Sequence, residues 1–143
     1  MTNRSVPAHF VLPHVVYSDV ARAIDWLGKA FGFIEHYHYG EPPQGAQIRL
    51  GEAYVMLRSS RQDSDSPARA GKWTQSLTIF VDDVDGHYRA AKAAGARIVE
   101  EPNEVMYGER QYAALDHEGH RWLFSKHVRD VDPAEWGAKI ISS

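Results

Sequence analysis

Two stretches of this chain share one pattern, and this duplication restricts the possible folds more than any other feature. The segments VVYSDVARAIDWLGKAFGF (15–33) and TIFVDDVDGHYRAAKAAGA (78–96) each place a short apolar run before an Asp and an amphipathic stretch. A shift of 64 residues pairs Asp19 with Asp83 and Val20 with Val84. The repeat indicates two copies of one structural module, and 143 residues are enough for a single domain with a real core.

Each copy is predicted to contain one amphipathic helix. Positions 20, 24, 27 and 31 form a stripe at helical spacing, and positions 84, 88, 91 and 95 form its counterpart. Asp19 (or Ser18) and Asp83 precede the stripes, where a side-chain oxygen can cap the first free N–H groups of a helix. Gly32 and Gly95 are expected to end the helices, because glycine tolerates a left-handed backbone.

Strand-like runs surround both helices, one before each helix and three after it. They are FVLPHVVY (10–17), FIEHYHY (33–39), AQIRL (46–50) and AYVMLRSS (53–60) in the first copy, and SLTIFV (76–81), RIVE (97–100), RQYAALD (110–116) and HRWLFSKHV (120–128) in the second. Two unrelated amphipathic helices would not explain this repeated order. The pattern therefore predicts an α+β fold made of two βαβββ modules.

The boundaries follow from composition. We expect module one over residues 10–60, a mobile polar linker over 61–73 and module two over 74–128. Near the C-terminus, DVDPAEWGAKI predicts a short helix within 132–141, capped by Asp132 and ended by Gly137. Trp136 of that helix is expected to pack on the domain or on a partner chain.

The order of these elements, with a helix that ends at the Gly of KAFGF and a closing hairpin DHEGHRW, resembles the vicinal oxygen chelate superfamily. This is the group of glyoxalases, bleomycin-resistance proteins and extradiol dioxygenases. The segment YGERQYAALDHEGHRWLFSKHV looks most like the PhnB-like branch, and the resemblance covers roughly residues 10–128. It implies two modules whose curved mixed sheets surround a shared ligand cleft, often within a homodimer.

In the metal enzymes of that superfamily, the first and fourth strands of each module supply the ligands. The resemblance maps these four positions onto Leu12, Met56, Ser76 and Leu123. Divalent metals at such sites need imidazole or carboxylate donors, which none of these residues provides. We therefore expect a protein without a bound metal and without another cofactor.

The segment DHEGHRWLFSKH (116–127) raises the opposite possibility, because it holds three histidines and two carboxylates. Asp116 to Gly119 form the turn of a predicted hairpin, so we expect His117 and His120 at the rim, in structural or solvent-exposed roles. His36 and His38 share one face of a strand, and for them a solvated edge position is favoured over metal binding. Whether His14, His36 or His38 ever binds metal stays open.

Strand alternation predicts which side chains face the cleft. Residues that share a face with the four mapped positions complete the predicted ligand-binding set, which is Leu12, His14, Tyr54, Met56, Arg58, Ser76, Thr78, Arg121, Leu123 and Ser125. Such a mixed surface fits a small organic ligand. Arg58 or Arg121 can hold a carboxylate or phosphate, although a plain surface role is at least as common for an arginine.

Composition limits the function classes. A net charge of −3 without a basic block argues against nucleic acid as the main partner, and no run of residues is long and apolar enough to span a membrane. The absence of cysteine fits a cytoplasmic protein and removes thiol nucleophiles. We expect a homodimer that binds a small organic ligand. The alternative is a lyase, isomerase or dioxygenase of the same superfamily with non-standard catalytic or metal residues, and its catalytic residues are unknown.

Overall fold

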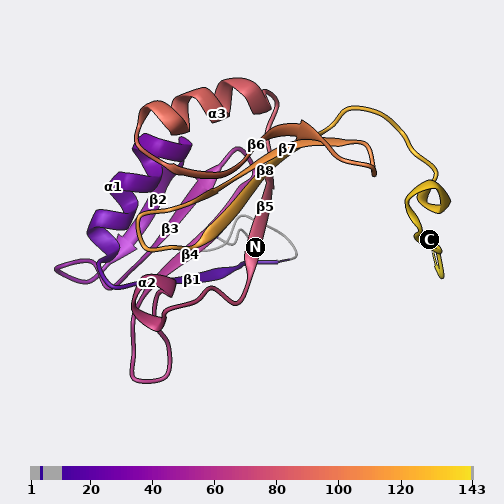
Figure 1. The fold of residues 1–143 in the computed structure, drawn as a ribbon. Helices are drawn as coiled ribbons and strands as arrows, with labels where there is room; N and C mark the ends of the chain where they lie inside the picture. Colours follow the sequence, from indigo (N-terminus) through magenta and orange to yellow (C-terminus); the bar gives the residue numbers. More distant parts are fainter. Residues whose placement is uncertain (1–3, 5–10, 143) are drawn as a thin grey trace.

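The computed structural model describes residue 4 and residues 11–142, and shows two four-stranded mixed sheets with the two long helices on one side (Figure 1). The first sheet has the order β1-β4-β3-β2 and the second has the order β5-β8-β7-β6. The strands are β1 His14–Tyr17, β2 Ile34–Tyr39, β3 Gly45–Leu50, β4 Ala53–Ser59, β5 Ser76–Phe80, β6 Arg97–Glu104, β7 Glu109–Leu115 and β8 Arg121–His127. The helices are α1 Val20–Phe31, α2 Pro67–Ala70, α3 Val84–Ala93 and the 3-10 helix η1 Pro133–Trp136.

The two sheets repeat one topology, which confirms the predicted pair of βαβββ modules. In each, the strand before the helix pairs in parallel with the last strand of its module, β1 with β4 and β5 with β8. The register also repeats, because His14 lies beside Met56 and Thr78 lies beside Leu123. The predicted α+β fold is thus confirmed.

Both long helices begin where the sequence predicts and α1 also ends there, whereas α3 ends one residue early, with Ala94 as its C-cap just before the left-handed Gly95. The Asp19 side chain accepts a hydrogen bond from Arg22 N, and the Asp83 side chain accepts one from Gly86 N. Gly32 ends α1 with a φ of 82°, in the left-handed region that costs glycine little. The caps satisfy backbone N–H groups that a helix otherwise leaves unpaired at its first turn.

One hydrophobic core joins the modules. Helices α1 and α3 lie side by side (Figure 1), and Phe31 at the end of α1 reaches into module two. Its ring centroid lies 4.8 Å from that of Phe124 and 5.9 Å from that of Trp122, both on β8. Full burial of a side chain such as Phe31 stabilises a fold by about 1.5–3 kcal/mol. The modules are therefore one folding unit.

The linker is the first departure from the sequence expectation. It is not a free connector, because it contains α2 and lies against the β7–β8 turn, where Ala68 N donates to Glu118 O over 2.8 Å. Ser66, just before α2, is fully buried. The polar composition of residues 61–73 gave no sign that backbone hydrogen bonds hold this segment in place.

Other differences concern boundaries. β1 starts at His14, later than the predicted start at residue 10, which lies outside the described residues. The C-terminal helix is a single 3-10 turn over Pro133–Trp136, capped by Asp132 and ended by Gly137, so residues 138–141 are not helical. Trp136 makes an edge contact with Tyr107, with ring centroids 5.7 Å apart. Among the described residues, no helix is long and apolar enough to cross a membrane.

Candidate functional site

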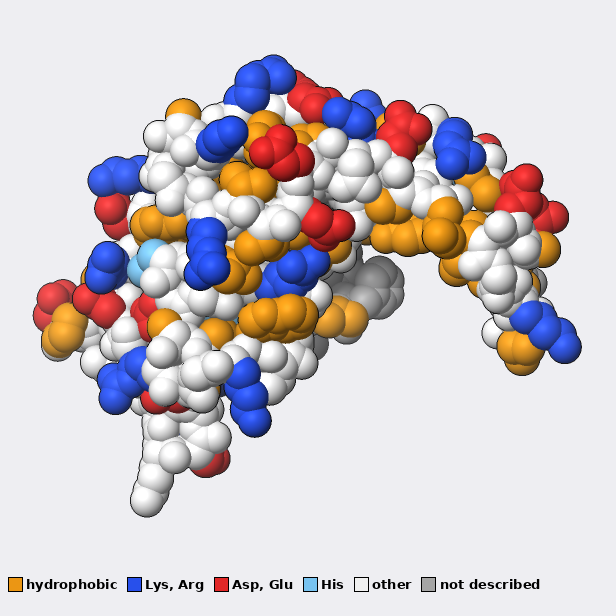
Figure 2. Space-filling model, in the orientation of Figure 1, with side chains coloured by type: hydrophobic (Ala, Val, Ile, Leu, Met, Phe, Trp, Pro, Cys, Tyr) orange, Lys and Arg blue, Asp and Glu red, His pale blue; other side chains and the backbone are white. Residues whose placement is uncertain are grey.

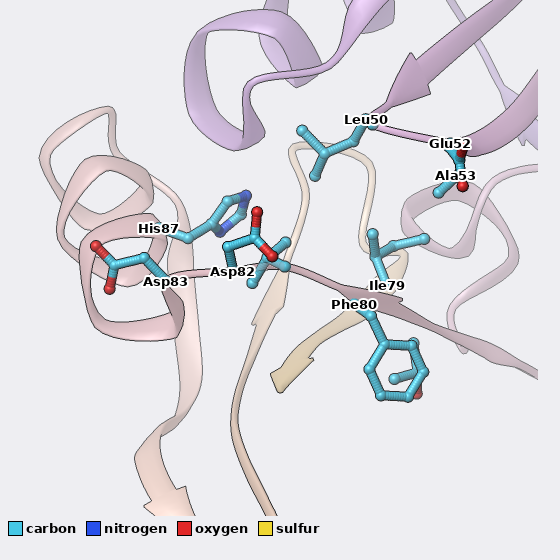
Figure 3. A pocket seen from close by; sticks show the side chains of 11 residues that line it. Leu50, Glu52, Ala53, Ile79, Phe80, Asp82, Asp83 and His87 are labelled. Carbon is cyan, nitrogen blue, oxygen red and sulfur yellow. The ribbon is translucent and has the colours of Figure 1, made fainter. Parts of the chain in front are cut away.

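A pocket of about 840 Å³ opens between the modules (Figure 3). On one side stands the tight turn between β3 and β4, and on the other stand the end of β5 and the first turns of α3. The described residues that line it are Leu50, Gly51, Glu52, Ala53, Thr78, Ile79, Phe80, Val81, Asp82, Asp83 and His87. The pocket is a joint product of both modules, because neither contributes all of its walls.

The wall formed by β5 is an open sheet edge. β5 is an outer strand that pairs only with β8, and Val81 N just beyond it donates to Ser125 O. Backbone polar groups alternate in direction along a strand, so those of Thr78 and Phe80 point away from β8, towards the pocket side. Phe80 is 65% exposed, so its side chain offers apolar surface beside this edge.

His87 lines the pocket but is already engaged. Its Nε2 donates to Phe31 O over 2.7 Å, and its Nδ1 lies against the Tyr112 hydroxyl. Burial lowers the pKa of His87 and raises that of Tyr112, so both are neutral at pH 7. A neutral imidazole that donates from Nε2 accepts the Tyr112 O–H at Nδ1. Because both ring nitrogens are occupied, His87 is a fixed part of the wall and ties α1 to module two.

The charged groups of the pocket are carboxylates. Glu52 and Asp82 are exposed and form no hydrogen bond or ion pair with other residues that the structure describes, whereas Asp83 caps α3. In Figure 3 the Asp82 side chain points towards the side where Leu50 lies, while Asp83 is turned away towards the helix. The pocket thus combines apolar walls, an open strand edge and free negative charge.

Four residues of the predicted ligand-binding set gather on one face of module one. His14 lies beside Met56 in the β1–β4 register, and Tyr54 and Arg58 flank Met56 on the same face at the alternation of β4. The Arg58 Nη1 atom lies 3.4 Å from His14 Nδ1. Leu12 comes just before β1 and is partly buried. The register therefore agrees with the predicted shared face, and the prediction that this face binds a ligand stays a prediction.

Five more residues of the set gather on module two. Ser76 lies beside Arg121, Thr78 beside Leu123 and Phe80 beside Ser125. Arg121 Nη2 donates to Glu100 over 3.0 Å, and its guanidinium lies over the Trp73 ring. Ser125 is fully buried.

The structure does not bring the ten residues into one pocket. The two groups lie on separate sheets, and of the ten only Thr78 lines the pocket between the modules. Phe80 could have been found in the sequence, because alternation along the strand puts it on the face of Ser76 and Thr78. No sequence signal pointed to Glu52 or Asp82, which lie in a turn and just after a strand.

A further miss lies on module one. Gln47 on β3 is fully buried beside Met56, and its Oε1 accepts a hydrogen bond from His36 Nδ1 at 2.6 Å. A β-bulge between Glu35 and Tyr37 places one extra residue of β2 opposite β3. This bulge brings the His36 side chain next to Gln47. The side chain of His36 also stacks on Tyr54, with ring centroids 5.9 Å apart. The prediction that His36 is merely solvated was therefore incomplete.

The histidine-rich turn differs most from the expectation. It is buried against module one and the linker, not exposed at a rim. Asp116 Oδ2 accepts hydrogen bonds from Tyr17 Oη at 2.6 Å and from Trp122 Nε1 at 3.0 Å, and its Oδ1 accepts from Glu118 N and His120 N. Glu118 accepts from Ser18 N at 2.8 Å, at the start of α1. The turn joins the modules, so the structural half of the expectation holds and the solvent-exposed half is wrong.

Both histidines of the turn are engaged in this junction. His120 Nε2 donates to Val16 O over 2.6 Å. The His117 side chain is only 6% exposed and lies between the rings of Tyr17 and Trp26. Burial lowers the pKa of His117, although the nearby carboxylates of Asp116 and Glu118 act in the opposite direction. The imidazole is thus a neutral packing element at pH 7.

The residues at the four mapped metal positions do not fit a divalent ion. Leu12 and Leu123 offer only hydrocarbon, Met56 offers a thioether that contacts Gln47 Nε2 at 3.4 Å, and Ser76 offers a neutral hydroxyl. Across the described part of the chain, no three His, Asp or Glu side chains converge as a metal site would require.

A model of the glyoxalase/bleomycin resistance protein/dioxygenase superfamily matches residues 7–124. The chain belongs to this superfamily. Among its relatives in the superfamily fold, the solved structure of TioX from Micromonospora sp. ML1 has a TM-score of 0.72 and 31% identity, and the match covers 85% of this chain and 100% of TioX.

Two further matches extend the comparison. An uncharacterized protein of Mycobacterium tuberculosis (strain ATCC 25618 / H37Rv) is 30% identical over 138 residues, which cover 91% of this chain and 81% of the relative. A superfamily enzyme from Burkholderia phytofirmans PsJN has a TM-score of 0.61 at 19% identity, over 82% of this chain and 97% of that one, and so shows the fold alone.

Proposed function

We propose that this superfamily member is a metal-free protein that binds a small organic ligand in the pocket between its modules. The observation that carries the proposal is the pocket itself. Its volume of about 840 Å³ lies within the range of roughly 300–1,000 Å³ typical of small-molecule sites. Apolar walls with a few directed polar groups are the usual composition of such sites.

The walls offer both kinds of contact. Leu50, Ile79, Phe80 and Val81 provide apolar surface, and the strand edge at Thr78 and Phe80 provides backbone donors and acceptors. Hydrocarbon, thioether and hydroxyl groups at the mapped metal positions favour binding over metal chemistry. The nine predicted ligand-binding residues outside the pocket remain candidates for a second contact surface on the sheet faces.

We further propose that the protein acts as a homodimer. Figure 2 shows hydrophobic side chains on the inner side of the arch between the body of the molecule and the C-terminal segment. Exposed apolar residues of the β6–β7 turn and of that segment include Met106, at 64%, and Ile141, at 84%. Association is a usual way to cover such surface. Light scattering that gives a mass near 16.1 kDa at micromolar concentration would contradict it.

Two finer assignments rest on sequence alone. Membership in the PhnB-like branch is supported by the Tyr-Gly before the last hairpin and by the Gly-His-x-Trp after its turn. A cytoplasmic location is supported by a chain without cysteine.

The pocket is tested with dansylamide, a neutral fluorescent probe whose emission rises in apolar surroundings. We expect saturable binding that weakens about tenfold in Phe80→Ala, because the ring is the largest apolar group at the rim. Ile34→Ala is the matched control, since Ile34 is 53% exposed on β2 against 65% for Phe80 but does not line the pocket. Equal losses in both variants, or no saturable binding, would contradict the proposed site.

A further inference from the structure

We infer that residues 131–142 form a C-terminal arm that docks on a second copy of this chain, so that two copies exchange their arms reciprocally. The inference rests on the homodimer proposed above and adds the segment and the surface that form its interface. The arm projects beyond the β6–β7 hairpin, away from the sheets and the long helices (Figure 1). Between the arm and the body lies a hollow whose inner side carries hydrophobic side chains (Figure 2).

The direction in which the arm leaves the body is fixed by backbone contacts. Val128 N and Arg129 N donate to Gly108 O over 2.9 and 3.2 Å, at the turn between β6 and β7. Gly108 has a φ of 88°, and a methyl group at this position would overlap the Arg129 carbonyl oxygen. His127 Nε2 also donates to Asp130 Oδ1 over 2.7 Å. The arm therefore starts in a set direction, which leads away from its own sheets.

The arm gains little burial from its own chain. The turn η1 gives it regular structure, yet none of the described residues of the arm is buried. Trp136 is 37% exposed and meets the Tyr107 ring at its edge, and beyond it Ile140 and Ile141 are 64% and 84% exposed. Ordering a segment costs conformational entropy, which burial has to offset. These apolar side chains therefore need a surface outside their own chain.

The same molecule carries an apolar surface that suits the arm. Around the β6–β7 turn, Met106 is 64% exposed, Tyr107 40% and Val128 41%. A two-fold interface is self-complementary, because each patch meets its counterpart on the other copy. Two arms that enter each other's hollows cover both arms and both hairpin turns at once, and leave no patch over for a third chain. A second copy is therefore the occupant that this surface fits.

Full-length variants test the contribution of the arm to association, measured by sedimentation equilibrium. The double variant Ile140→Ser, Ile141→Ser should raise the dimer dissociation constant at least about hundredfold, because each dimer loses the burial of four isoleucines. Ile34→Ser is the matched control, since Ile34 is 53% exposed on β2, and it should change the constant by less than about twofold. Far-UV circular dichroism should be unchanged in both, which separates lost association from lost folding.

Cross-linking identifies the copy that the arm contacts, because the chain has no cysteine of its own. Tagged Met106→Cys is mixed with untagged Ile141→Cys and treated with a short bismaleimide. Reciprocal docking predicts a product that joins the two variants, whereas Ile34→Cys in place of Met106→Cys should give little of it. In a double variant with both Met106→Cys and Ile141→Cys, the link should join two chains and double the mass on a denaturing gel.

The outcomes separate the two proposals. If the double isoleucine variant dimerises as well as the unmodified chain, the homodimer stands and the arm inference is overturned. A link that stays within one chain also overturns the inference, because the arm would then fold back on its own hairpin. If the unmodified chain is a monomer at micromolar concentration, the proposed homodimer and the inference both fail.

Discussion

The carboxylates near the two ends of the β5–β8 strand pair have opposite environments: they are buried and hydrogen-bonded at one end, and exposed and unpaired at the other. At the end where Ser76 lies beside Arg121, the adjacent turn buries Asp116 and Glu118 and bonds both to module one. At the end where Phe80 lies beside Ser125, Glu52 and Asp82 border the open pocket without partners among the described residues. The first arrangement holds the modules together, and the second leaves both carboxylates exposed to solvent.

The difference also shows how to interpret a cluster of titratable residues. The histidine-rich turn attracts attention in the sequence, yet Asp116, Glu118 and His120 form hydrogen bonds within the fold. Buried polar groups in proteins are generally paired in this way. The ring nitrogens of His117 are buried and have no hydrogen-bond partner among the described residues. The free carboxylates stand where the sequence shows no motif. Substitutions at the two ends should therefore affect different properties, and the predictions below test that separation.

The largest effect is expected for Asp116→Ala. It removes the acceptor of Tyr17 Oη and Trp122 Nε1, and both donors are fully buried. A buried donor without a partner costs about 1–3 kcal/mol, so we expect a loss of about 3–5 kcal/mol in the free energy of unfolding, measured by urea denaturation. Asp82→Ala should change it by less than about 0.5 kcal/mol. Similar losses in both variants would show that the two ends do not differ.

A smaller loss is expected for Glu118→Gln. The two carboxylate oxygens accept from Ser18 N at 2.8 and 3.0 Å and from Asp19 N at 3.3 Å, so they bind backbone donors just before α1. An amide keeps one acceptor and loses the charge, and we expect about 1–2 kcal/mol of destabilisation by denaturant titration. Glu52→Gln is the control at the pocket end and should be neutral. If Glu118→Gln leaves the free energy of unfolding unchanged, the stability of module one does not depend on this contact.

The junction also predicts a pH dependence. Burial lowers the pKa of His117 below the ordinary histidine value of about 6.5. His117 therefore takes up a proton at a higher pH in the unfolded chain than in the folded chain. The free energy of unfolding falls as the pH drops below about 6.5, and it does not depend on this group well above that pH. The groups around the ring are Asp116, Glu118, Arg22 and His120.

His117→Phe removes the titrating group but keeps an aromatic ring between Tyr17 and Trp26. Thermal melts between pH 8 and pH 5 should show a shallower decline for this variant than for the unmodified protein. An unchanged slope in His117→Phe would assign the decline to another group, with His87, whose pKa is also lowered by burial, as the next to test.

The sequence predicted most of the fold and only part of the site, for physical reasons. Caps such as Asp19 and strand parity such as that of His14, Met56 and Arg58 are local properties, and the structure confirms them. The contact of Tyr17 with Asp116 joins residues 99 positions apart, which no spacing rule reveals. The position of His36 depends on a bulge in β2. Glu52 lines the pocket because the β3–β4 turn lies close to module two, a tertiary contact that local sequence does not indicate.

The smallest effects concern the arginines and decide between the pocket and the sheet faces as the ligand site. Arg121 is already paired with Glu100 and lies over Trp73, whereas Arg58 Nη1 lies 3.4 Å from His14 Nδ1. Neither arginine lines the pocket. If the ligand lies in the pocket, Arg58→Ala and Arg121→Ala should each change dansylamide affinity by less than about twofold, or about 0.4 kcal/mol.

The sheet faces predict a different result. A ligand held there by an arginine would lose affinity by at least about fivefold in Arg58→Ala, since removing a charged partner costs more than about 1 kcal/mol. Fluorescence titration of dansylamide and dansylglycine into both variants separates the cases, because the anionic probe would depend most on an arginine. A fivefold loss in Arg58→Ala with no loss in Phe80→Ala would move the ligand from the pocket to the face shared by His14, Met56 and Arg58. The free carboxylates at the other end of β5 would then have no part in recognition.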